Sequence, residues 1–124
     1  MNRESLAGER ARIDLTWDGE LGEGTIRRLR DEVAAGLVEL RGDGDVLFVA
    51  RLEVAPAYRG YGLGTECARL IRERAERGEW RTLRAWAPPN LGLAVYFWSR
   101  MGLRPLHGEG SGGGLWFERT VGGK

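Results

Sequence analysis

Apolar and polar residues alternate near the start of the chain, which is the pattern of a strand with one buried face. Residues 11–17 place Ile13, Leu15 and Trp17 on one side, with polar residues between them. The segment 19–24 is rich in glycine and acidic residues and is predicted to be a loop. The chain therefore begins its regular structure with a half-buried strand.

The next segment allows two interpretations. Residues 25–29 and 33–40 can form two strands, and a single helix over 26–40 is the alternative. Gly36 in the middle of this segment favours strands, because glycine weakens the interior of a helix. Residues 41–45 contain Asp-Gly, which supplies the positive-φ positions of a tight hairpin turn. We expect two strands followed by that turn.

A strand and a helix follow with clearer signals. Residues 46–54 are almost continuously apolar, which predicts a central strand, and Pro56 ends it because proline cannot donate to the ladder. From residue 63 to 77 apolar residues recur at spacings of three and four, and Gly78 suits the end of that helix. The apolar face of the predicted helix consists of Leu63, Cys67, Leu70, Ile71 and Ala75.

The last third continues with a strand, a helix and two strands. A strand is predicted over residues 80–86, and Asn90 can cap a helix that runs to Met101. Two final strands, near 103–107 and 115–121, flank a glycine-rich loop. Strands that precede and surround two helices predict one α+β domain over residues 1–124.

Composition excludes several classes of function. The net charge of +1 offers no field for nucleic acid, and the arginines of the predicted first helix alternate with glutamates. No apolar run approaches the ~20 residues that cross a membrane, and the polar N-terminus lacks a signal-peptide core. A single cysteine, Cys67, and a single histidine, His107, argue against a metal site. These features indicate a cytoplasmic protein without nucleic-acid or membrane partners; Cys67 is expected to be a core thiol.

The most informative segment joins the central strand to the first helix. Gly60, Gly62 and Gly64 alternate in this turn, where the absence of Cβ atoms lets backbone N–H groups point inward. Together with the positive end of a helix dipole, such donors can bind a diphosphate, and Arg59 can add charge at the rim. A Rossmann site requires Gly-x-Gly-x-x-Gly, and a Walker loop requires Gly-Lys before Ser or Thr, so neither matches.

Residues 59–64, Arg-Gly-Tyr-Gly-Leu-Gly, instead resemble the CoA-pyrophosphate loop of the GNAT N-acetyltransferases, Gln/Arg-x-x-Gly-x-Gly/Ala. The preceding Val54-x-Pro56-x-Tyr58 is similar to the usual lead-in of that family. Residues 90–103 are similar to its last helix. The resemblance covers the chain from about Val33 to the C-terminus.

The resemblance implies a GNAT fold, with a central, mostly antiparallel, splayed sheet of about six or seven strands and two main helices. The N-terminal helices of the family are expected to be reduced or absent, because the segment between Trp17 and Thr25 is too short for two helices. It also implies acetyl-CoA as co-substrate, with pantetheine along the central strand and the pyrophosphate in the loop. The residues expected to bind it are Leu52, Val54, Arg59, Gly60, Tyr61, Gly62, Leu63, Gly64, Thr65, Asn90 and Trp98.

The sequence offers fewer candidates for catalytic residues than for residues that bind the co-substrate. The alternation of a strand places Leu47, Val49, Arg51 and Glu53 on one face, and Glu53 at the strand's end is the candidate general base. The alternative is that Glu53 and Arg51 form a solvated face or an ion pair. Trp98 stands where the family usually has the tyrosine that protonates the thiolate. It is interpreted as a wall of the thioester pocket or as ordinary core, and the two interpretations are compatible.

The expected activity is acetyl transfer from acetyl-CoA to an amine of a small molecule, peptide or protein, by direct attack in a ternary complex. The acceptor side is expected to be open or covered by a partner subunit, so a homodimer is one expected arrangement. Two alternatives remain. One is a CoA-binding module without catalysis, and the other is an interaction domain whose glycine loop is only structural.

Overall fold

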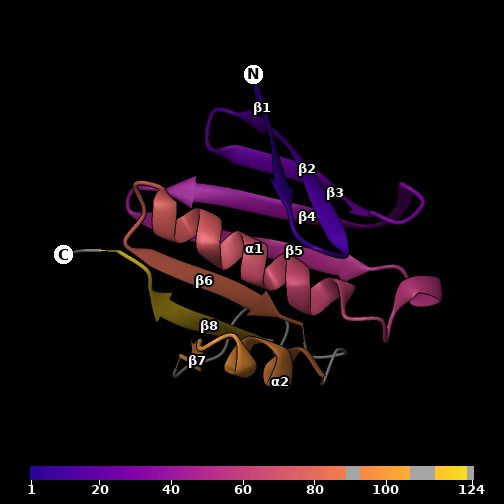
Figure 1. Ribbon diagram of the computed structural model, residues 1–124. Helices are drawn as coiled ribbons and strands as arrows, with labels where there is room; N and C mark the ends of the chain where they lie inside the picture. Colours follow the sequence, from indigo (N-terminus) through magenta and orange to yellow (C-terminus); the bar gives the residue numbers. More distant parts are fainter. Residues whose placement is uncertain (89–92, 107–113, 123–124) are drawn as a thin grey trace.

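The computed structural model describes residues 1–88, 93–106 and 114–122, and these form one eight-stranded sheet with two α-helices on it (Figure 1). The sheet order is β1-β2-β3-β4-β5-β6-β8-β7, and only the β5–β6 pair is parallel. The predicted α+β class and mostly antiparallel sheet are confirmed, with eight strands instead of about six or seven. The elements are β1 (Asn2–Ala7), β2 (Ala11–Asp18), β3 (Leu21–Arg28), β4 (Val33–Asp43), β5 (Val46–Val54), the 3₁₀ helix η1 (Pro56–Tyr58), α1 (Leu63–Arg77), β6 (Thr82–Ala87), α2 (Leu93–Arg100), β7 (Arg104–Pro105) and β8 (Leu115–Thr120).

The predicted loop over residues 19–24 is wrong, because β3 already begins at Leu21. Its glycines serve packing within the sheet instead of a loop. A Cβ on Gly22 would lie 2.9 Å from the Trp17 ring, and one on Gly24 would lie 2.7 Å from Leu15. The glycines therefore leave room for large side chains of β2. The strand β1 was also not predicted, because it is an edge strand with mostly exposed residues.

The remaining elements agree more closely with the sequence. The helix α1 has the predicted bounds, and residues 25–28 and 33–40 form strands, which excludes the alternative helix. The strand β6 begins at Thr82 instead of residue 80, and β7 is only two residues long. Asn90, the predicted cap of α2, and His107 lie outside the described residues.

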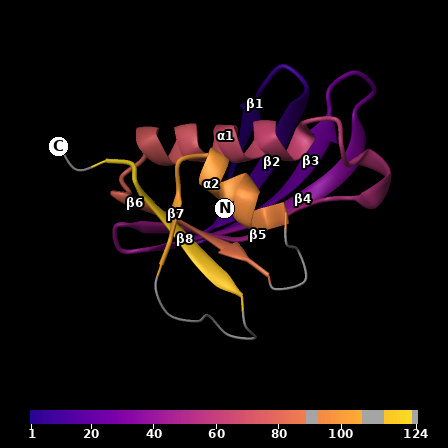
Figure 2. The ribbon, with the colours of Figure 1, turned by 90° about the horizontal axis from the view of Figure 1, so that it is seen from below.

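Both helices pack on the same face of the sheet, as Figure 2 shows. Arg72 of α1 donates a hydrogen bond to the backbone carbonyl of Met101, just after α2 (3.4 Å). Burial raises the pKa of the Cys67 thiol to about 12, as expected for a core cysteine and not for a nucleophile. The largest fully buried side chains between helices and sheet are Ile13, Leu15, Ile26, Val38, Leu47, Val49, Cys67, Ile71, Leu83 and Phe117.

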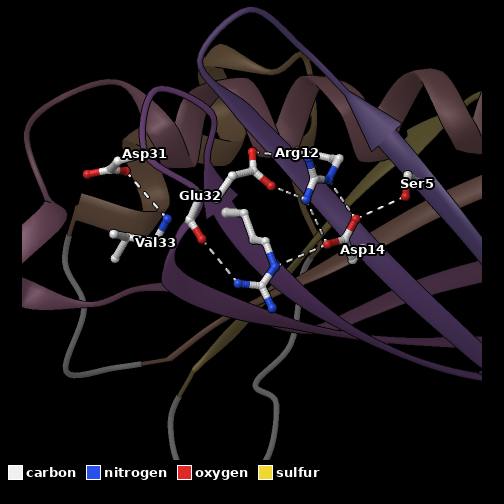
Figure 3. A network of polar contacts seen from close by, with 7 residues as sticks. Ser5, Arg12, Asp14, Asp31, Glu32 and Val33 are labelled. Carbon is white, nitrogen blue, oxygen red and sulfur yellow. Dashed lines mark hydrogen bonds and ion pairs between the residues drawn. The ribbon is translucent and has the colours of Figure 1, made fainter.

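Neither helix covers the opposite face of the sheet, which we call the bare face. On β1 to β3 it carries a network of polar contacts centred on Asp14 (Figure 3). Asp14 accepts hydrogen bonds from Ser5 (2.9 Å), from Arg12 (2.8 Å) and from Arg27 (3.2 Å). The bond from Arg12 is the main cause that lowers the pKa of Asp14. This polar surface explains why the face tolerates exposure to solvent. No helix among the described residues has the length and hydropathy to span a membrane.

Candidate functional site

The strands β5 and β6 separate along their length, as the resemblance to the GNAT family implied. Their parallel pairing starts at Val46 with Thr82 and ends at Val49 with Ala85. The strand β5 continues to Val54, so its last five residues have no partner on the side of β6. Unpaired main-chain groups of a strand can bind an extended ligand as an added strand would. The unpaired end of β5 therefore presents main-chain groups with which an extended ligand can pair.

A β-bulge in β5 coincides with the start of this gap. Leu40 of β4 pairs with Val49, and its neighbour Glu39 pairs with Arg51, which leaves Ala50 as the extra residue. A bulge bends its strand and increases the local twist. The bulge at Ala50 therefore turns the end of β5 away from β6.

The bulge also corrects the predicted faces of β5. The expectation that Glu53 shares a face with Leu47 and Val49 is wrong, because one extra residue reverses the alternation. Leu47 and Val49 are fully buried under the helices, and beyond the bulge Leu52 and Val54 pack against the same core. Glu53 consequently lies on the bare face.

The glycine loop between η1 and α1 presents free backbone donors. Among the described residues, no acceptor is bonded to the N–H groups from Gly60 to Thr65, and the first backbone bond of the helix is donated by Glu66 to the carbonyl of Gly62. Gly60 and Gly62 have φ angles of 87° and 80°, which L-residues rarely adopt. These donors stand at the positive end of a 15-residue helix. The loop is thus suited to bind a diphosphate.

Arg59 and Tyr61 flank these donors. The Nε of Arg59 donates a hydrogen bond to the carbonyl of Val54 at 2.8 Å, which holds this guanidinium at the open end of β5. The Tyr61 side chain is 65% exposed and contributes a large apolar surface to the rim of the loop. Arg59, a predicted ligand residue, therefore lies between the end of β5 and the glycine loop, and Tyr61 lies in the loop itself.

The helix α2 contributes a residue that sequence reasoning missed. Trp98 is 3% exposed and belongs to the hydrophobic core, which agrees with the ordinary-core interpretation. Its partly exposed neighbour Phe97 contacts it edge-on, and the Phe97 ring lies 3.7 Å from where a Cβ on Gly64 would be. Phe97 is thus an aromatic side chain beside the loop. Asn90, another predicted ligand, lies outside the described residues.

A cavity of about 350 Å³ opens on the bare face, next to the point where β5 and β6 separate. Ala50 of β5 and Trp86 of β6 both line it, so it adjoins the gap between these strands. This cavity was not predicted from the sequence, because its lining residues come from five strands that are spread along the chain. The lining consists of Leu21, Gly22, Glu23, Glu39, Leu40, Arg41, Phe48, Ala50, Trp86 and Trp116.

The cavity combines aromatic walls with two carboxylates and one guanidinium, that of Arg41, which lies 4.8 Å from the centroid of the Phe48 ring. The Trp116 ring packs against Phe48 (5.4 Å between centroids) and Trp86 (5.1 Å). Glu23 and Glu39 are directly opposite each other on β3 and β4. Like charges at such positions destabilise a sheet, whereas a cation between them would relieve the repulsion.

Glu53 lies near this cavity but does not line it. Arg51 bridges two carboxylates, with its guanidinium 3.0 Å from Glu53 and 3.4 Å from Glu39. The hydrogen bond to Glu53 is the main cause that raises the pKa of Arg51. The structure thus contains the ion pair that was the alternative interpretation of Glu53, and the bridge connects Glu53 to the wall of the cavity.

Comparison with known proteins agrees with this geometry. The profile of the acetyltransferase (GNAT) family matches residues 4–103. A putative acetyltransferase from Sphaerobacter thermophilus is similar in structure, with a TM-score of 0.74 and 12% identity, covering 94% of this chain and 98% of that one. A probable GNAT-family acetyltransferase from Chromobacterium violaceum has a TM-score of 0.75 and 10% identity, covering 94% and 91%.

A GNAT-family acetyltransferase from Elizabethkingia anophelis with acetyl-CoA bound has a TM-score of 0.67 and 11% identity, covering 82% of this chain and 77% of that one. At these identities the likeness concerns the fold. No curated protein matches the chain. Because the family profile spans most of the sequence and the fold agrees, the chain belongs to the GNAT acetyltransferase family.

Proposed function

We propose that this protein is an acetyl-CoA-dependent N-acetyltransferase that acts on an amine of a small molecule, peptide or protein. The observation that carries the proposal is the run of free backbone donors from Gly60 to Thr65 at the end of the gap between β5 and β6. Structures of family members with acetyl-CoA or coenzyme A bound support the choice of co-substrate.

The loop and the unpaired end of β5 divide the binding of the co-substrate between them. The amides of Gly60–Thr65 would bind the diphosphate, and Arg59 would add a positive charge at the end of β5. The backbone of Leu52–Val54, which has no strand partner on the side of β6, would bind pantetheine, and a backbone N–H in this stretch would polarise the thioester carbonyl. Bound acetyl-CoA supplies the thioester whose acetyl group the amine receives.

The acceptor is proposed to enter from the bare face. The cavity there adjoins the gap, so an amine in it would approach the thioester from the side opposite the helices. Glu23 and Glu39 would hold the ammonium group, and Phe48, Trp86 and Trp116 would hold an apolar part of the acceptor. This arrangement favours a cationic amine attached to an apolar body.

The reaction needs a base and a proton donor. Glu53 is proposed to take the proton that converts the bound ammonium group to the free amine. The nitrogen then bonds to the carbonyl carbon as the carbon–sulfur bond breaks, and the second proton leaves the nitrogen to solvent. The departing thiolate would take its proton from solvent, because Trp98 occupies the usual place of the tyrosine donor and is buried in the core. The bridge through Arg51 would hold Glu53 beside the cavity.

Two measurements in sequence test the function. Calorimetry with CoA comes first, and acetyl transfer to a panel of alkyl and aromatic amines follows. Binding with turnover is the expected result. Binding without turnover would instead support a CoA-binding module, and no binding at millimolar CoA would support an interaction domain.

Single substitutions separate the roles of the three carboxylates. E53Q is expected to lower kcat by about a hundredfold with little change in KM, as for the loss of a general base. E23Q and E39Q are expected mainly to raise KM for the amine. E79Q, at an exposed position after α1, is the matched control. A wild-type kcat for E53Q would exclude Glu53 as the base.

A further inference from the structure

The turn between β1 and β2 is attached to the first turn of α1. The Glu66 carboxylate accepts hydrogen bonds from the backbone amides of Glu9 (2.9 Å), Arg10 (2.7 Å) and Ala11 (2.6 Å). A Cβ on Gly8 would lie 2.5 Å from the carboxyl carbon of Glu66, so glycine is needed for this approach. Three bonds to one carboxylate fix the turn against the start of the helix.

This attachment places the Arg10 side chain on the glycine loop. Its Nη1 lies 2.8 Å from where a Cβ on Gly62 would be. Arginines of α1 form ion pairs, such as Arg69 with Glu73 and Arg74 with Glu4. No carboxylate of the described residues forms an ion pair with Arg10. The guanidinium thus lies over the loop with its charge available.

We propose that Arg10 binds the diphosphate of CoA and that Glu66 is the residue that positions it. This inference rests on the proposed function, because it requires a diphosphate in the loop. A guanidinium is planar and presents paired N–H donors that match phosphate oxygens. Arg10 comes from a turn more than fifty residues before the loop, so it supplements the backbone donors of Gly60–Thr65 with a full charge.

The direction in which CoA affinity changes when the Glu66 charge is removed distinguishes a positioning role from direct electrostatic repulsion. A carboxylate close to a bound diphosphate repels it, so removing that charge alone would tighten CoA binding. If Glu66 instead holds the turn that carries Arg10, removing its charge weakens CoA binding. In E66Q the new NH₂ group cannot accept bonds from the turn amides. The two explanations therefore predict opposite changes in affinity.

The first test is calorimetry of wild type, R10A and R10K with CoA and with dephospho-CoA, which lacks the 3′-phosphate. R10A is expected to weaken both ligands equally, by about tenfold, as for the loss of a charge-assisted hydrogen bond, and R10K by less. The control R81A removes an exposed arginine at the start of β6, beyond the far end of α1, and should stay within twofold. Unchanged affinity in R10A, or a loss confined to CoA, would overturn the assignment to the diphosphate. A wild-type protein that binds neither ligand would refute the proposed function itself.

The second test is a double-mutant cycle between Glu66 and Arg10. E66Q is expected to weaken CoA binding about fivefold in the wild-type background and not at all in R10A. Tighter binding by E66Q, or an equal loss in both backgrounds, would overturn the positioning role. G8A provides an independent variant if E66Q unfolds, because its Cβ would push the turn away from the Glu66 carboxylate. The same loss of affinity is expected from G8A.

Discussion

Gly36 of β4 and Glu53 of β5 lie so close that a methyl group on Gly36 would overlap the backbone carbonyl oxygen of Glu53. The end of β5 is thus drawn against β4 at the point where it no longer pairs with β6. With the bulge at Ala50, this contact explains how one strand can leave its neighbour while it remains in the sheet. The gap depends on a glycine in the adjacent strand.

Gly36→Ala is therefore expected to damage both the fold and the gap. The added Cβ must push β5 away from β4, and such overpacking costs about 1–3 kcal/mol of unfolding free energy. CoA affinity should fall as well, because the displaced backbone borders the gap. Urea unfolding and calorimetry measure the two effects. Wild-type values in both would show that the close contact does not shape the gap.

Two glycines of the loop should respond differently to alanine. Gly62 has a φ of 80° and faces the Arg10 guanidinium, so Gly62→Ala strains the backbone by about 1 kcal/mol and lowers CoA affinity at least tenfold. A Cβ on Gly64 would meet Val54 at 3.5 Å and Phe97 at 3.7 Å, which are ordinary contacts. Gly64→Ala is the matched control and should bind CoA within twofold of wild type. Equal losses in the two variants would contradict the role of the Gly62 backbone.

The first strands and the glycine loop show what the sequence could predict. The helix α1 and the strand β5 were predicted with their bounds because continuous periodicity defines them. The first half of the strand β3, residues 21–24, was missed because Gly22 and Gly24 indicate a loop unless the Trp17 and Leu15 side chains that fill their space are known. A local pattern does not reveal such packing across strands.

The candidate site also contains residues that could be predicted from the sequence and residues that could not. The loop Gly60–Thr65 was predictable because its chemistry lies in adjacent residues. The prediction of the sheet face on which Glu53 lies was wrong, because the bulge at Ala50 reverses the alternation of side chains along β5. The sequence pattern does not predict this bulge. The cavity brings together residues from separate strands, among them Glu23 and Trp116. Because the strand order alone makes them neighbours, no single segment of the sequence predicts the cavity.

The polar network on the bare face predicts a dependence of stability on pH. The folded state lowers the pKa of Asp14 from 3.8, mainly through the bond from Arg12. A carboxyl with a depressed folded pKa stabilises the fold above its unfolded pKa, and this stabilisation is lost as the pH falls through the lower folded value. Because the Asp14 side chain is 37% exposed, solvent screens its ion pairs and the effect should be below about 1 kcal/mol.

Urea unfolding from pH 6 to pH 3 measures this effect. Asp14→Asn should lose less stability over that interval than the wild type does. The control Asp18→Asn lies at the end of the same strand and, in the described part of the chain, forms no ion pair. Its stability should change with pH as the wild type's does. Identical pH profiles for Asp14→Asn and wild type would contradict the stabilising role of the network.

Amide NMR tests the central claim most directly, namely that backbone N–H groups at the start of α1 bind the diphosphate of CoA. A ¹⁵N-labelled chain of 13.8 kDa is small enough for complete amide assignment. On titration with CoA, the largest shifts are expected for the amides of Gly60–Thr65, with smaller shifts for Leu52–Val54. Saturating CoA that leaves the amides of Gly60–Thr65 unshifted would contradict the account.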